Sequence, residues 1–210
     1  MLFKCVSLLT GATLLAPLTI DRIAVPPPND PTYASDGKLE FPANYREWVY
    51  LSSGLDMSYT ARVASAGDHS MFDNVFVNPE AYKAFKETGT WPDKTMMVLE
   101  VRMAETAASI NRNGRTQGGE LMGVEVHVKD QAKFANTKGW AFYGFDKTGA
   151  GEKGDLLPAT ASCYSCHEQH GAVDTSFVQF YPTLLPIAKQ KNTLSASYVK
   201  DEAASKQTGK

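Results

Sequence analysis

Three segments in the middle of the chain have the composition of β-strands, and they constrain the fold more than any other feature. Residues 95–103 are apolar and β-branched, residues 121–129 alternate between apolar and polar side chains, and residues 139–145 are largely aromatic. An Asn-Gly step within residues 111–114 offers a turn between the first two segments. Hairpin connections of this kind join antiparallel strands. The sequence therefore predicts a mainly β (α+β) fold, in which a few helices flank an antiparallel sheet.

The alternation within residues 121–129 assigns the side chains to two faces of the strand. One face carries the valines Val124, Val126 and Val128. The opposite face carries the polar residues Glu125, His127 and Lys129. The pattern alone allows this polar face to be either solvated or part of a site.

A helix is predicted over residues 42–50. Pro42 is well placed at a helix start. Tyr45, Trp48 and Val49 have the spacing that brings side chains to one helical face.

A second helix is predicted over residues 79–88. Asn78 can cap this helix, Pro79 suits its first turn, and Gly89 can end it.

Residues 163–167 read Cys-Tyr-Ser-Cys-His, which is the attachment signature of a c-type haem. Cys163 and Cys166 would bond the haem vinyl groups as thioethers, and His167 would be the proximal axial ligand of the iron. We therefore predict one covalent haem c per chain. Its cofactor-binding residues are Cys163, Cys166 and His167, and the iron ligand is His167.

Three other interpretations of this motif fit less well. A thioredoxin-like dithiol belongs at the start of a βαβ unit, and no such pattern surrounds the pair. A zinc site could use Cys163, Cys166, His167 and His170, but the adjacent side chains of Cys166 and His167 rarely converge on one tetrahedral ion. A disulfide between the two cysteines would close a very short loop and stabilise little.

The ends of the chain differ in composition from its body. Residues 1–20 place one lysine, Lys4, before a mostly apolar run, as in a secretory signal peptide. Residues 21–38 form a proline-rich leader, residues 39–191 form the predicted haem domain, and residues 192–210 form a predicted flexible tail. Export to the periplasm agrees with the haem motif, because thioether attachment in bacteria takes place outside the cytoplasm.

The charge distribution argues against nucleic acid as a partner. The net charge is −2, the pI is near 6.1, and the Lys and Arg residues are scattered instead of forming a stripe. The same scatter argues against binding to an anionic membrane surface.

Several blocks of the sequence resemble the cytochrome P-460 family. The most specific block surrounds the haem motif, residues 161–174, and continues into residues 177–182. Further similarity lies in residues 71–78, 124–130 and 139–142. The resemblance extends over roughly residues 40–187, and the chain is also similar to cytochrome c′-beta.

This resemblance implies a periplasmic homodimer with a mostly β fold and one haem c per chain, acting on small nitrogen species. Cytochromes P-460 oxidise hydroxylamine, often together with nitric oxide, and carry a lysine joined covalently to the porphyrin rim. A soluble c-type cytochrome would accept the electrons. The c′-beta branch lacks that lysine and binds nitric oxide or carbon monoxide in an apolar pocket.

The sequence leaves open to which branch the chain belongs. The strand expected at 95–103, where a cross-linking lysine could face the haem, contains none. Lys94 precedes this strand and Lys129 ends the next one, so each is a candidate, although each also fits a solvated strand end. Glu125 is a candidate catalytic base, because hydroxylamine oxidation releases protons.

Three functions therefore remain as hypotheses. The first is enzymatic oxidation of hydroxylamine, and the second is binding of nitric oxide or carbon monoxide without turnover. The third is simple electron transfer, with a methionine such as Met96, Met97 or Met103 as the sixth ligand.

Overall fold

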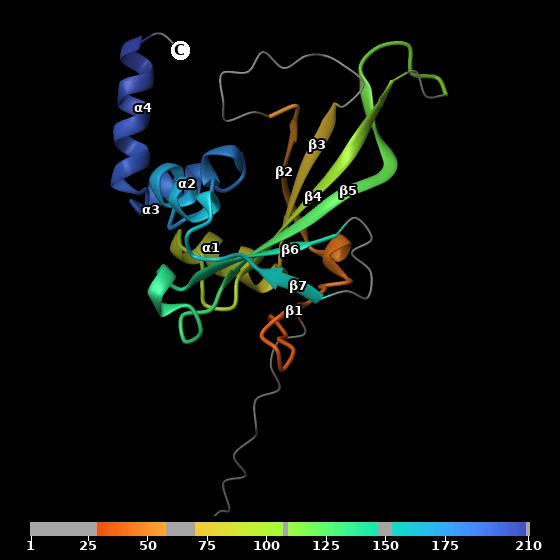
Figure 1. Ribbon diagram of the computed structural model, residues 1–210. Helices are drawn as coiled ribbons and strands as arrows, with labels where there is room; N and C mark the ends of the chain where they lie inside the picture. Colours follow the sequence, from red (N-terminus) through yellow and green to blue (C-terminus); the bar gives the residue numbers. More distant parts are fainter. Residues whose placement is uncertain (1–28, 58–69, 107–108, 147–152, 209–210) are drawn as a thin grey trace, which may run out of the picture.

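The computed structural model describes residues 29–57, 70–106, 109–146 and 153–208. Within these residues, seven strands form one antiparallel sheet in the order β1-β7-β6-β5-β4-β3-β2, and four α-helices accompany it (Figure 1). The strands are β1 (Leu39–Glu40), β2 (Val49–Leu55), β3 (Met71–Val77), β4 (Met96–Thr106), β5 (Arg115–Lys129), β6 (Trp140–Phe145) and β7 (Lys153–Leu156). The helices are α1 (Pro79–Thr88), α2 (Ser162–His170), α3 (Leu185–Lys191) and α4 (Ala196–Thr208). None of the helices in the described part of the chain has the length and apolar character needed to cross a membrane.

The three strands predicted from the sequence are confirmed as β4, β5 and β6, and they are antiparallel neighbours in the sheet. The mainly β fold with flanking helices is likewise confirmed. The β4–β5 hairpin is longer than predicted, since its pairing continues to Thr106 and Arg115.

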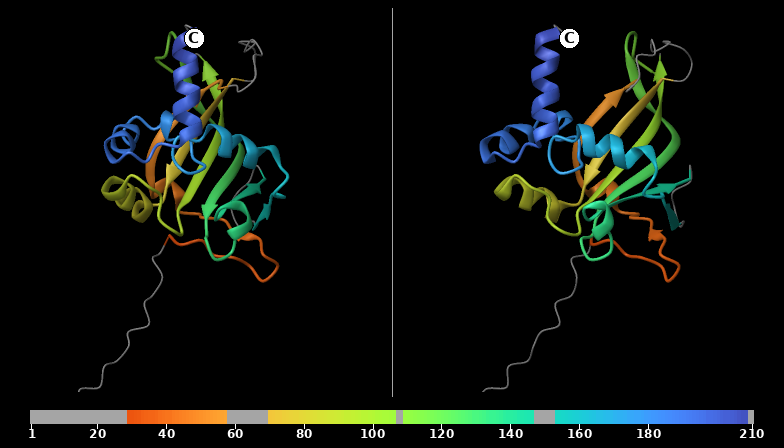
Figure 2. Two further views of the ribbon diagram at one scale, coloured as in Figure 1. Left: turned by 90° about the vertical axis from the view of Figure 1, so that its left-hand side faces the viewer. Right: turned by 60° about the vertical axis from the view of Figure 1, so that its left-hand side comes forward.

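The sheet separates two hydrophobic clusters, one on each face. The first cluster lies under the helices, and it includes Val77, Phe85, Trp91, Met97, Trp140 and Leu184. The second lies on the opposite face, and it includes Leu39, Tyr45, Trp48, Val98, Val126 and Tyr143. Figure 2 shows the helices gathered on one side of the sheet. Met97 and Val98 belong to different clusters, as the alternation of side chains along a strand requires.

Helix α1 confirms the prediction over residues 79–88. Pro79 occupies the first turn, and Gly89 ends the helix with a φ of 78°, a left-handed conformation that favours glycine. Asn78 does not cap the helix through its side chain. Its Oδ1 instead accepts a hydrogen bond from the Met96 backbone N–H at 2.9 Å, which ties the helix start to β4.

The helix predicted over residues 42–50 is wrong. The chain makes one 3-10 turn, η1 (Tyr45–Glu47), and then enters β2 at Val49. Tyr45 and Trp48 do share a face, but as two anchors of a single turn, and both are buried in the second cluster. Pairing of β2 with β3 outweighs the helical spacing.

The predicted tail is helical over most of its length, in contrast to the flexible segment expected from its composition. Helix α4 begins at Ala196, and Tyr198 in its first turn is buried in the first cluster. His170 Nδ1 and Asp201 Oδ2 lie 2.9 Å apart and link α2 to α4. One buried aromatic residue thus anchors a helix whose composition is otherwise that of a solvated segment.

The predicted signal peptide, residues 1–20, lies outside the described residues. The described end of the proline-rich leader packs on the domain. Tyr33 contacts the rings of Phe134 and Tyr143, and its hydroxyl lies 3.2 Å from Asp130 Oδ2.

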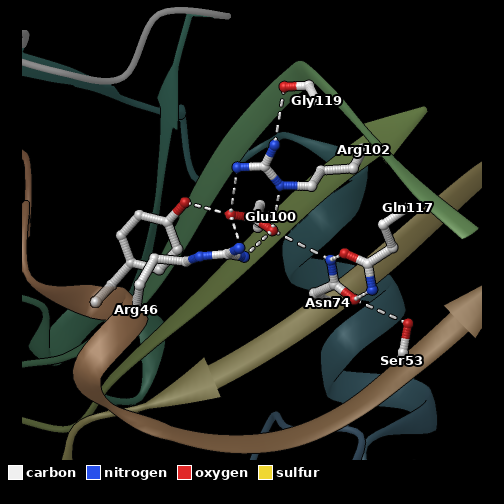
Figure 3. Close-up of polar contacts among 8 residues, drawn as sticks. Arg46, Ser53, Asn74, Glu100, Arg102, Gln117 and Gly119 are labelled. Carbon is white, nitrogen blue, oxygen red and sulfur yellow. Dashed lines mark hydrogen bonds and ion pairs between the residues drawn. The ribbon is translucent and has the colours of Figure 1, made fainter. Parts of the chain in front are cut away.

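A polar cluster centred on Glu100 (Figure 3) includes Tyr45, which belongs to the second hydrophobic cluster. The Glu100 side chain has no exposed surface. Its carboxylate accepts hydrogen bonds from Tyr45 (2.5 Å), Arg46 (2.7 Å), Arg102 (2.8 Å) and Asn74 (3.1 Å). Burial favours the neutral acid, but the hydrogen bonds and the arginine charges outweigh it and hold the pKa of Glu100 below its usual 4.5. The cluster joins η1, β3 and β4.

Candidate haem-binding site

Helix α2 places the three motif side chains on one side. Cys163 and Cys166 are one turn apart, and His167 lies four residues after Cys163, which are the spacings of neighbours on a helix surface. Both thiols are free and partly exposed, as attachment to a vinyl group requires. Burial, together with the charge of Glu125, raises the pKa of the Cys163 thiol.

The His167 ring is held in one tautomer. Its Nδ1 lies 2.7 Å from the backbone carbonyl oxygen of Thr175. Because a carbonyl only accepts hydrogen bonds, Nδ1 carries the proton, and Nε2 is left with the lone pair that a metal uses. Burial lowers the pKa of His167, against the opposing effect of this hydrogen bond, and keeps the ring neutral.

The chain folds back directly after α2 to bring Thr175 beneath His167. Gly171 permits this return, since a Cβ there would lie 2.7 Å from the His167 carbonyl oxygen and 2.9 Å from the Ser176 nitrogen. Val173 and Ser176 then pair through their backbones and close a tight turn. We call residues 173–176 the ligand turn.

A cavity of about 280 Å³ separates α2 and the ligand turn from the sheet. Its walls are mostly apolar. The sheet contributes Val75, Met97, Leu99 and Phe142, and the segment after the ligand turn contributes Phe177, Phe180 and Tyr181. His167 also lines the cavity.

The two ends of the cavity differ. The His167 ring contacts Phe142 of β6 and His127 of β5, at centroid distances of 4.7 and 5.0 Å. The opposite wall includes Ser52 and Gly54 of β2, three strands away from β5 in the sheet. The cavity therefore extends from His167 towards β2 and β3.

These residues fit a c-type haem. Two free thiols on one side of a helix, a neutral imidazole with its Nδ1 proton committed, and an adjoining apolar cavity match the anchors, ligand and pocket that the group needs. The zinc alternative loses support, because no group of three potential metal ligands comes together among the described residues.

Comparison with known families agrees with this site. The sequence model of the family described as Cytochrome P460 matches residues 42–178, more than half of the chain. The chain belongs to the cytochrome P460 family. Membership implies a haem cofactor, and it makes this a haem protein of the P460/c′-beta type. A comparison with curated proteins returns no match.

Neither lysine proposed for a cross-link lines the cavity. Lys94 Nζ pairs with Asp130 at 2.7 Å. Lys129 Nζ donates to the Trp91 carbonyl oxygen at 2.7 Å and pairs with Asp174 at 3.0 Å. The solvated strand end considered for Lys129 is also wrong, since its side chain is only 10% exposed.

Glu125 lies on the cavity wall, and its side chain is exposed. The same wall holds a second carboxylate, Asp73 of β3, which the sequence reasoning missed. Burial, with the charges of Asp56 and Glu125, raises the pKa of Asp73. The sequence could have indicated this residue, because alternation along residues 71–77 places Asp73 on the same face of the strand as Val75.

The methionines considered as sixth ligands differ in whether they line the cavity. Met97 lines the cavity, whereas Met96 packs in the cluster on the opposite face. Met103 is not among the described residues that line the cavity. Met57 lines it as well and packs against Gly54, where a Cβ would lie 2.1 Å from the Met57 sulfur.

Replacing His167 by alanine should remove the nitrogen ligand while leaving both thioether positions in place. We expect a changed ferric optical spectrum and altered binding of nitric oxide. His170→Ala is the matched control, because His170 lies on the same helix but pairs with Asp201. An unchanged spectrum in His167→Ala would mean that another residue is the ligand.

Proposed function

We propose that this protein is a periplasmic mono-haem c-type cytochrome that binds nitric oxide without turnover, like the c′-beta branch of its family. One observation carries the proposal. Among the described residues that line the cavity there is no lysine. An amine can join the porphyrin rim only if it lies against the rim, so the porphyrin should stay unmodified. Family resemblance then predicts weak hydroxylamine oxidation at most.

The cavity walls suit a small, uncharged diatomic ligand. The bound haem would supply the iron site to which the gas binds. The chain itself supplies the neutral His167 on one side and the apolar surfaces of Val75, Met97 and Leu99 beneath. These three apolar side chains offer no strong hydrogen bonds that would favour a polar ligand over a diatomic gas.

Intact-mass spectrometry of the purified holoprotein tests the absence of the cross-link. We expect the mass of the processed chain plus one haem, because Lys94 and Lys129 are engaged in ion pairs away from the cavity. A mass lower by about two hydrogens, assigned by peptide digestion to either lysine, would contradict the proposal.

Hydroxylamine oxidation is the second candidate, and the two cavity carboxylates favour it. Glu125 and Asp73 line the same cavity, and either could accept protons released from a nitrogen substrate. A soluble c-type cytochrome would take the electrons. Steady hydroxylamine oxidation that falls about 100-fold or more in Glu125→Gln or Asp73→Asn would support this candidate over simple gas binding.

The raised pKa of Asp73 has a consequence for stability. When the pKa of an acid is higher in the folded protein than in the unfolded chain, ionising that acid destabilises the fold. The protein therefore becomes less stable as the pH rises above 3.8, the ordinary pKa of the Asp side chain. Asp73→Asn should therefore raise the thermal midpoint at neutral pH, and the gain should vanish below about pH 3.8. Asp36→Asn, at an exposed position, is the control and should leave the thermal midpoint at neutral pH nearly unchanged. A neutral-pH midpoint equal to that of wild type would contradict the raised pKa.

Homodimerisation and export to the periplasm are proposed on the family resemblance and the N-terminal sequence. Electron transfer with a methionine ligand is the weakest alternative, although Met97 and Met57 both reach the cavity wall.

A further inference from the structure

Three consecutive side chains of the ligand turn are each held by a residue from another segment: two from β5, and one from the segment between α1 and β4. The pairs are Asp174 with Lys129 at 3.0 Å, Thr175 Oγ1 with His127 Nε2 at 3.2 Å, and Ser176 Oγ with Trp91 Nε1 at 2.7 Å. Thr175 and Ser176 are buried. A surface turn needs no such anchoring, so the contacts indicate that the position of this turn matters.

His127 is the member of this set whose chemistry is hardest to explain by packing alone. Its ring is stacked on Phe142 at 4.1 Å with an interplanar angle of 7°, and it lies 4.3 Å from Trp140. Only 7% of the residue is exposed. A phenylalanine would fill the same space without burying a polar ring, which is unfavourable unless the ring is hydrogen-bonded. What histidine adds is the bond to Thr175.

Thr175 connects His127 to the haem ligand. Its hydroxyl meets His127, while its backbone carbonyl accepts the proton of His167 Nδ1 at 2.7 Å. Fixing the Thr175 side chain therefore restrains the carbonyl that orients the His167 ring. The His127 ring also packs edge-on against His167, with centroids 5.0 Å apart.

We propose that His127 is a positioning residue for the haem ligand, acting through the Thr175 hydroxyl. This inference rests on the proposed ligation of haem by His167. A well-aligned bond from Nδ1–H to the carbonyl increases the basicity of the ligating nitrogen, which favours the ferric state. Loss of the His127 contact should loosen this bond and raise the reduction potential.

The test is a double-mutant cycle on the holoprotein, with the reduction potential and the NMR signals of the His167 ring as readouts. His127→Phe keeps a stacked ring and removes both ring nitrogens, while Thr175→Val keeps the side-chain shape and removes the hydroxyl. Outer-shell changes alter metal affinity by about 10-fold or more. A tenfold change in the ferric-to-ferrous preference corresponds to about 59 mV for one electron.

We expect each single variant to raise the potential by about this amount, and the double variant to raise it no further, because all three lack the same contact. Thr175→Ser, which keeps the hydroxyl, should retain the wild-type potential. His127→Gln, whose side-chain amide can take the place of Nε2 in the bond to Thr175, should have a reduction potential close to that of wild type.

The proposal would be overturned if both single variants kept the wild-type potential and ring signals while losing only stability. Fully additive shifts would overturn it too, since the two residues would then act independently. Failure of the His167 assignment is distinguishable, because it would appear as an unchanged spectrum in His167→Ala regardless of this cycle.

Discussion

Replacing both Cys163 and Cys166 by alanine should abolish covalent haem. The two thiols lie on one side of α2 beside the apolar cavity, and among the described cysteines there are no others to replace them. After denaturing electrophoresis, we expect the wild-type band to retain haem stain through organic extraction and the double variant to lose it completely. Each single variant should keep one thioether.

Ser165→Ala is the matched control for this experiment. Ser165 lies between the two cysteines on the same helix, and its hydroxyl donates a hydrogen bond to the Ser162 carbonyl oxygen within α2. Its haem content should equal that of wild type. Haem that stays covalently bound in the double variant would refute the assignment of the motif.

Glu100→Gln should produce the largest loss of stability of the variants considered. The substitution keeps the size of the side chain, but it removes the charge that Arg102 and Arg46 neutralise. It also gives Tyr45 a weaker acceptor. Breaking a buried ion pair by removing one partner costs about 3–5 kcal/mol. We expect the free energy of unfolding, measured with denaturant, to fall by about 3 kcal/mol. This is the lower end of that range, because Arg46 is half-exposed and partly solvated.

The same substitution should change the pH dependence of unfolding. Because the pKa of Glu100 in the folded protein is below 4.5, the ionised side chain contributes fully to stability above about pH 4.5. This contribution is lost as the pH falls below that value. The difference between wild type and Glu100→Gln should therefore shrink in acid. Glu105→Gln, exposed on the same strand, should leave the free energy of unfolding nearly unchanged. Equal losses in the two variants would contradict the role of the buried cluster.

Much of the fold could be predicted because the strongest sequence signals were also locally determined. Strand alternation over residues 121–129 follows from sheet geometry, and proline and glycine delimit α1. The helix predicted over residues 42–50 was wrong because contacts between distant segments determine the structure there. The apolar residues with helical spacing lie in or next to a single 3-10 turn, and the residues after it pair with β3 as a strand.

The sequence alone could single out the two thiols and the imidazole of the candidate site, whereas it could not single out the residues of the cavity wall. Cys163, Cys166 and His167 are adjacent in sequence, so their spacing carries the signal. Asp73 and Met57 reach the cavity wall, and Thr175 reaches His167, only when segments distant in the sequence pack together. No residue spacing in the sequence predicts these contacts. The polar face of β5 was recognised, but only the structure shows that α2 and the ligand turn cover it and bury His127 and Lys129.

The optical spectrum of the purified ferrous protein, recorded before and after addition of nitric oxide, tests the central proposal most directly. His167 would hold an unmodified haem c, and no second side chain would bind the iron, so we expect an ordinary five-coordinate spectrum that converts fully on adding the gas. A Soret band strongly shifted to the red before addition would contradict this account, because it would indicate a lysine-linked porphyrin. A six-coordinate low-spin spectrum that resists nitric oxide would contradict it as well, because it would mean that a second side chain binds the iron.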